Sequence, residues 1–278
     1  MTLEQPTLTA GGANVPQLGF GTWQMESDTA RRMVGEAIGI GYRHIGTAYI
    51  YKNEAAVGEG MRDSGVSRDD LFVTTKIWVD SFAEGDLQRA AEASVERLGL
   101  TPDLLLLHWP KASPPLAETI PALNDARTRG FTKHIGLSNF PSAQWREAQA
   151  LSEAPLITNQ VEYHPYLSQK TIIATAAELG GLVTAWSPLA QGRAIDDVVI
   201  AAIAAAHGKS TGQVALRWLI QQGVIAIPKT QSSDRAAENF AIFDFSLTDD
   251  EMARIHALAE EGGRIGDWID PAFQFDRD

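Results

Sequence analysis

The chain has 278 residues, of which 44% are hydrophobic and 21% are charged, proportions typical of globular proteins and unlike those of disordered or membrane chains. The formal net charge of −12 disfavours a nucleic-acid surface, because binding to phosphate backbones depends on clustered Lys and Arg. The absence of Cys excludes disulfides, thiolate metal sites and a Cys nucleophile, and is compatible with a reducing cytoplasm.

Neither a leader nor a membrane span is expected. The first twenty residues have no basic start and no apolar core of the kind a signal peptide needs. The longest apolar run, 198–206, is far shorter than the roughly 20 residues that cross a bilayer. We therefore expect a cytoplasmic protein.

The chain opens with a predicted hairpin, in which Gly11 and Gly12 form the turn between strands at 7–9 and 14–16. After it, short apolar runs alternate with amphipathic segments. Several of these runs are almost entirely apolar, as strands buried on both faces should be. The predicted strands are 17–20, 43–47, 71–75, 103–107, 134–137, 156–160, 182–186 and 224–227.

The segments between the predicted strands have apolar residues at helical spacing. The segment 28–40 carries apolar residues on one face and stops at Gly41, and 86–98 does the same before Gly99. A capping box at 248–251 begins a last helix. Eight strands separated by helices predict one domain, 1–278, with a (β/α)8 TIM barrel, an N-terminal hairpin, and a C-terminal helix and loop over the site. A doubly wound open sheet is the alternative, but its GxGxxG turn is missing after the first strand.

Polar or aromatic residues end these strands repeatedly. Barrel enzymes build their sites from such strand ends and the loops that follow. A lone strand-end Lys is more often a solvated charge, and a lone His more often a structural side chain, but six coincidences on one rim favour a site. No His, Asp and Glu cluster has metal spacing. The rim residues are Lys76, His108, Ser138 with Asn139, Gln160, Trp186 and Lys229.

The segment 41–54, GYRHIGTAYIYKNE, resembles the aldo-keto reductase motif GxRHIDTAxxYxNE. The resemblance extends over essentially the whole chain, through TTKIW, LLLHWP, GLSNF, NQVEYHP and AWSPLAQG. Within the family, the chain looks like the short bacterial members, such as the 2,5-diketo-D-gluconate reductases. It implies a catalytic group of Tyr51, Lys76 and His108. Gly46 stands where the family has the Asp that pairs with the Lys.

The same resemblance implies NADPH as cofactor. Ser138, Asn139 and Gln160 would hold the nicotinamide carboxamide, and Trp186 would stack on its ring. Lys229, Thr230 and Arg235 would take the 2'-phosphate, which agrees with the preference of phosphates for cations at a helix N-terminus. The alternative is an ordinary solvated turn. The remaining implied cofactor residues are Ser187, Leu189, Gln191 and Gly192 around the pyrophosphate and Glu238 and Asn239 at the adenine.

Aromatic residues are expected to wall the pocket for a small carbonyl substrate, although any one Trp is about as likely to belong to the core. We expect a monomer without nucleic-acid or membrane partners. His44 and His134 lie at the other end of the strands and receive no chemical role. The candidate wall residues are Trp23, Tyr49, Trp78, Trp109, Trp268 and Phe273.

Carbonyl reduction needs a proton donor beside the forming alkoxide. Tyr51 fits if Lys76 stabilises its ionised form, with His108 orienting the carbonyl. The loss of the carboxylate at Gly46 has opposed effects: a protonated Lys76 would act more strongly on Tyr51, but desolvation favours neutral Lys76. Two hypotheses follow: an NADPH-dependent reductase of aldehydes, ketones or keto sugars, impaired or redirected by Gly46, or an NADPH-binding sensor with negligible turnover.

Overall fold

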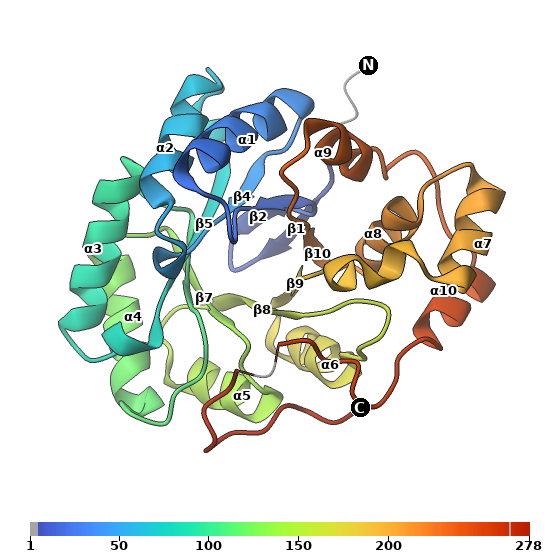
Figure 1. The fold of residues 1–278 in the computed structure, drawn as a ribbon. Helices are drawn as coiled ribbons and strands as arrows, with labels where there is room; N and C mark the ends of the chain where they lie inside the picture. Colours follow the sequence, from blue (N-terminus) through green and yellow to red (C-terminus); the bar gives the residue numbers. More distant parts are fainter. Residues whose placement is uncertain (1–4, 267) are drawn as a thin grey trace.

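A computed structural model describes residues 5–266 and 268–278 and confirms the barrel (Figure 1). Eight parallel strands form one sheet in sequential order. The last strand returns to the first, because Ala226 N donates to Gln17 O at 3.0 Å and Gly21 N donates to Pro228 O at 3.0 Å. The sheet is thereby closed. Its strands are β3 (Gly19–Gly21), β4 (His44–Gly46), β5 (Phe72–Ile77), β6 (Leu104–Leu107), β7 (His134–Ser138), β8 (Leu156–Glu162), β9 (Leu182–Trp186) and β10 (Ile225–Ile227).

Helices surround the strands on the outside (Figure 1). They are α1 (Ser27–Ile40), α2 (Glu54–Asp63), α3 (Asp86–Leu98), α4 (Leu116–Thr128), α5 (Ser142–Leu151), α6 (Lys170–Leu179), α7 (Val198–His207), α8 (Thr211–Gln221), α9 (Ser233–Phe240) and α10 (Asp249–His256). Short 3-10 turns are η1 (Tyr49–Tyr51), η2 (Arg68–Asp70), η3 (Val79–Ser81) and η4 (Ala190–Ile195). Among the described residues, none of these helices has the apolar length needed to cross a bilayer.

The hairpin closes the amino-terminal end of the barrel. Its strands β1 (Thr7–Ala10) and β2 (Ala13–Pro16) pair in antiparallel fashion, and Gly11 and Gly12 both have positive φ, as the predicted turn requires. A Cβ on Gly11 would lie 2.7 Å from Ile157 Cγ2, so only glycine allows this approach. Side chains of the hairpin pack against apolar side chains of several barrel strands in a small cluster. Access is therefore left to the carboxyl ends of the strands.

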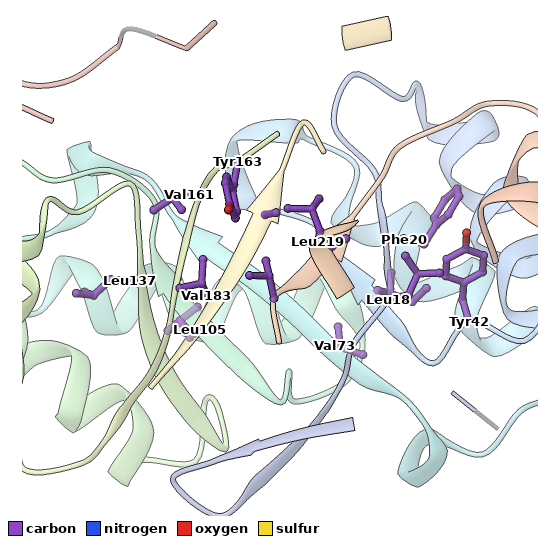
Figure 2. Packing of buried hydrophobic residues seen from close by; sticks show 14 of the residues in the cluster. Leu18, Phe20, Tyr42, Val73, Leu105, Leu137, Val161, Tyr163, Val183 and Leu219 are labelled. Atoms are coloured by element: carbon purple, nitrogen blue, oxygen red, sulfur yellow. The ribbon is translucent and has the colours of Figure 1, made fainter. Parts of the chain in front are cut away.

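The larger core lies between the strands and the outer helices. Figure 2 shows part of it, including Val73, Leu105 and Val183 from three strands and Leu219 of α8. Trp145 and Trp218 are fully buried in this core. Two strands run further than their apolar residues predict: β5 continues to Ile77 and β8 to Glu162. Because Lys76 pairs with Leu106 in the β5–β6 register, it lies inside the sheet and not in the following loop.

The C-terminal segment has two parts. The predicted capping box begins α10, which lies beside α7 on the outside of the barrel. The tail after α10 returns to the carboxyl ends of the strands, where Trp268 contacts Trp78. The tail is fastened further along by Asp276, which accepts from Ser142 N at 2.9 Å at the start of α5. Thus the loop reaches the site, while the helix stays at the periphery.

Candidate active site

Tyr51, Lys76 and His108 converge at the carboxyl ends of the strands. Lys76 Nζ donates to Thr47 O at 2.9 Å and lies 3.4 Å from the Tyr51 hydroxyl. The Tyr51 and His108 rings meet edge to face with their centroids 5.7 Å apart. Trp78 contacts His108 in the same manner, at 5.1 Å. The three side chains therefore form one group, supplied by η1, β5 and the loop after β6.

Lys76 is a buried amine with no carboxylate partner. It is 3% exposed, and no Asp or Glu oxygen of the described residues lies within ion-pairing distance of its Nζ. Burial lowers the pKa of Lys76 from 10.5 to about 7, opposed only by the more distant charge of Glu54. That carboxylate is held by Arg97, whose Nε donates to it at 2.7 Å. Lys76 is therefore about half charged at neutral pH.

Burial also shifts the two groups beside Lys76. It raises the pKa of Tyr51 above the ordinary value of a phenol. It lowers the pKa of His108 well below that of a free imidazole, and the neighbouring Lys76 lowers it further. At neutral pH, Tyr51 is thus a neutral phenol and His108 a neutral imidazole. The lowered pKa of Lys76 favours the second of the two opposed effects of Gly46 named above, the loss of charge on Lys76.

A second group of side chains links the ends of β7, β8 and β9. Asn139 Nδ2 donates to His108 O at 3.0 Å, and Trp186 Nε1 donates to Asn139 Oδ1 at 2.7 Å. Ser138 Oγ donates to the backbone oxygen of Gln160 at 2.8 Å. Gln160 Oε1 is buried and has no hydrogen-bond partner among the described residues. A buried acceptor without a partner costs roughly 1–3 kcal/mol, so an amide donor of a bound ligand fits this atom. The Asn139 amide, by contrast, is already occupied by protein partners.

The loop after β9 has a strained backbone. Ser187, Ala190 and Gln191 have φ of 50°, 49° and 53°, and Asn139 on the neighbouring loop has φ of 66°. Such conformations are costly for residues other than glycine and gather at ligand sites. Leu189 from this loop comes near Gly212 at the N-terminus of α8, where a Cβ would lie 3.9 Å from its Cδ1. The predicted pyrophosphate residues, including Gly192, therefore lie together on this loop.

The predicted phosphate site lies at the N-terminus of α9. Lys229 and Arg235 are both exposed, and within the described residues neither forms an ion pair. Ser232 caps α9 by accepting from Arg235 N at 3.4 Å, and Thr230 Oγ1 accepts from Ser232 N at 3.1 Å. One acidic neighbour was not predicted, because Glu36 of α1 accepts from Ser233. Of the predicted adenine residues on α9, Asn239 is buried and Glu238 is exposed.

The predicted pocket wall is assembled only in part. Trp268 lies against Trp78 at 5.1 Å and against Trp109 at 5.4 Å between ring centroids. Trp23 is 45% exposed and has no ring contact with this trio among the described residues. Tyr49 is turned towards α3, where the Arg97 guanidinium lies 5.0 Å from the centre of its ring.

A further tail residue, which was not predicted, reaches Trp109. The centre of the Phe275 ring lies 6.4 Å from that of Trp109. The sequence could not single it out, because the irregular tail has no periodicity that would show which of its aromatic rings faces the barrel, and the role of Phe273 stays a prediction. In the part of the chain that the structure describes, no group of His, Asp and Glu could hold a metal ion.

Comparison with known proteins agrees with this geometry. Residues 17–260 match the model of the aldo/keto reductase family. A solved structure of a candidate 2,5-diketo-D-gluconic acid reductase B is 45% identical, with a TM-score of 0.96 and 98% of each chain covered. Glyoxal reductase of Bacillus subtilis (strain 168) is 41% identical over 92% of each chain. A Bombyx mori aldo-keto reductase in complex with NADP is 34% identical, with a TM-score of 0.86 over 92% of this chain and 94% of the other. The chain belongs to the aldo/keto reductase family.

Proposed function

We propose that the protein reduces the carbonyl of an aldehyde, ketone or keto sugar to an alcohol with NADPH as hydride donor. The observation that carries this proposal is the convergence of Tyr51, Lys76 and His108 beside the free buried acceptor of Gln160. Carbonyl reduction requires that the hydride donor and the carbonyl compound be bound side by side, and this group of side chains can bind both. The similarity to a glyoxal reductase and to an NADP complex supports the same reading.

The residues on the rim fit the cofactor at both of its ends. Gln160 Oε1 would accept from the carboxamide, Trp186 would stack on the nicotinamide, and Lys229 and Arg235 would take the 2'-phosphate. NADPH supplies a hydride to the carbonyl carbon when bound. The Lys and Arg are exposed and unpaired among the described residues, so their charges are available to a phosphate dianion.

The protein's own groups would handle the oxygen of the carbonyl. Tyr51 would give its hydroxyl proton to the developing alkoxide, since it is a neutral phenol at neutral pH. His108 would donate a hydrogen bond to the same oxygen and fix its direction. Trp78 and Trp109 would exclude water from the reacting carbon, and Trp268 would cover the outer side of the pocket.

Gly46 is expected to slow this reaction. The departing proton leaves a phenolate on Tyr51, and a half-charged Lys76 stabilises it poorly. Loss of positioning of the amine adds to the cost, on the order of a hundredfold in rate. The same observation favours a second candidate function, a protein that binds NADPH as a sensor or interaction partner and turns over negligibly.

Steady-state oxidation of NADPH with a panel of aldehydes and diketones separates the two functions. Turnover that depends on the carbonyl compound supports the reductase. Tight binding of NADPH without turnover for any carbonyl compound supports the sensor. We further propose that the protein acts as a monomer, which the sedimentation coefficient of the purified chain tests directly.

A further inference from the structure

Glu162, at the end of β8, carries a carboxylate that the proposed reaction does not use. It is 0% exposed, and its two oxygens accept three hydrogen bonds. His164 Nε2 donates at 2.9 Å, Ile265 N at 2.6 Å and Gly266 N at 2.7 Å. Two of these three donors belong to the tail, about a hundred residues further along the chain. The carboxylate therefore binds the tail to the barrel.

The third donor is one ring nitrogen of His164. His164 is fully buried, and its Nδ1 has no partner among the described residues. A proton on Nδ1 would be a buried donor without an acceptor, so the tautomer with its proton on Nε2 fits this site. In that form Nε2 donates to Glu162. All three groups around the carboxylate are then donors, which is the arrangement that an ionised carboxylate requires.

The tail approaches the barrel very closely at this anchor. A Cβ on Gly266 would lie 2.5 Å from Trp186 Cη2 and 3.2 Å from Glu162 Oε2, so only glycine fits here. Glu162 and Trp186 are neighbours in the β8–β9 register. Two residues after Gly266 comes Trp268, whose ring covers Trp78 and Trp109 although it is 48% exposed. The anchor is thus a barrel contact that lies two residues before the ring that completes the pocket wall.

We propose that Glu162 is a positioning residue, which holds Ile265 and Gly266 so that Trp268 covers the carbonyl pocket, and thereby favours bulky aromatic carbonyl substrates over small aliphatic ones. This inference rests on the proposed reductase function. A bulky aromatic substrate gains contact with the Trp268 ring, and a small aldehyde bound at Tyr51 and His108 does not need it. Release of the anchor should therefore weaken the binding of bulky aromatic substrates and leave that of small aldehydes nearly unchanged.

Two variants release the anchor from opposite sides. Glu162→Gln keeps the shape of the side chain but turns one acceptor into a donor that faces other donors. Gly266→Ala keeps the Glu162 carboxylate but places a methyl group against the Trp186 ring of β9, so this variant serves only the exchange experiment. Glu178→Gln is the matched control, because Glu178 is an exposed carboxylate on α6 whose partner is Arg146 at 2.7 Å.

Hydrogen exchange tests the anchor itself without any turnover. In both anchor variants, the amides of Ile265 and Gly266 should exchange at least about tenfold faster, while those of β5 and β8 remain protected. Glu178→Gln should leave both regions unchanged. Unchanged exchange in Gly266→Ala and Glu162→Gln overturns the anchor, whether or not the protein proves to be a reductase. Exchange that rises equally in the barrel strands means that Glu162 only supports the fold, and also overturns it.

Steady-state kinetics test the effect on substrates. In Glu162→Gln, KM for a bulky aromatic aldehyde should rise at least about fivefold, the size expected for the loss of one aromatic contact, while kcat and KM for a small aliphatic aldehyde stay within about twofold. Trp268→Ala should raise KM equally, and adding Glu162→Gln to it should cause no further rise. An additive rise, or equal losses for both aldehydes, overturns the positioning role. Faster exchange with no turnover on any aldehyde would contradict the reductase and the proposed selectivity together, and leave the anchor standing.

Discussion

Gly46→Asp is expected to raise kcat for carbonyl reduction at least about tenfold, which corresponds to roughly 1.4 kcal/mol of barrier. The structure has room for the new side chain. A Cβ at Gly46 would lie 3.5 Å from Ile227 Cγ2 and 3.6 Å from its Cδ1, which are ordinary contacts. Lys76 Nζ donates to the carbonyl oxygen of Thr47, the residue next to Gly46. A carboxylate at position 46 would therefore branch from the backbone next to the residue that Lys76 already contacts.

The size of the effect follows from the state of Lys76. With its pKa at about 7, Lys76 is half charged at pH 7, so full protonation alone gains only about twofold. The remaining factor must come from fixing the ammonium beside Tyr51, since poor positioning can cost on the order of a hundredfold. Most of the expected tenfold gain therefore depends on the positioning of the ammonium.

The assay compares kcat on one generic aldehyde at saturating NADPH for the native protein, Gly46→Asp and Gly46→Asn. Asn has nearly the shape of Asp but no charge, and is expected to gain less than about threefold. NADPH affinity should be nearly unchanged in both variants. An unchanged or lower kcat in Gly46→Asp would mean that the site has been rebuilt around glycine. Equal gains with Asn and Asp would show that filling the space, and not the charge, matters.

Three further predictions concern cofactor choice and pH. Arg235→Ala should reduce the preference for NADPH over NADH at least about tenfold, because charge-assisted contacts to a phosphate contribute roughly 1.5–3 kcal/mol, and unchanged selectivity in tryptophan-quenching titrations would refute the phosphate site. The pKa of Lys76 is about 7 when folded and 10.5 when unfolded, so the unfolded chain binds more protons between these values and the free energy of unfolding should rise with pH, by up to roughly 5 kcal/mol; urea titrations should show this rise in the native protein and a smaller one in Gly46→Asp. Burial lowers the pKa of His44 from 6.5 to about 4, so the free energy of unfolding should fall by up to roughly 3 kcal/mol as pH falls through that range, and His44→Gln should remove this part of the acid sensitivity; an unchanged acid profile would contradict it.

The alternation of apolar runs and helices predicted the barrel, because each run and each helical face is a local pattern. Strand ends were less predictable: Lys76 is polar, but its burial between neighbouring strands keeps it within β5. The positions of Tyr51 and His108 followed from motifs and strand ends. The protonation states of the two side chains could not be predicted, because they depend on how deeply the folded barrel buries each group.

The contacts that the sequence did not predict join residues that lie far apart along the chain. Glu162 lies in the segment NQVEYHP, but nothing in that segment indicates that its carboxylate binds the backbone of Ile265 and Gly266. The bond from Trp186 to Asn139 likewise depends on how β7 and β9 are placed on either side of β8. The irregular tail gave no periodic signal, so the contact of Trp268 was only a general expectation.

The central claim is that a Tyr51-dependent carbonyl reduction takes place at this site. It is tested most directly by NADPH oxidation with the panel of aldehydes and diketones, measured side by side for the native protein and Tyr51→Phe, which deletes only the hydroxyl. We expect slow but measurable turnover in the native protein, a fall of at least about a hundredfold in Tyr51→Phe, and unchanged NADPH affinity. Equal rates in the two proteins, or no turnover of any carbonyl compound by the native protein, would contradict the account.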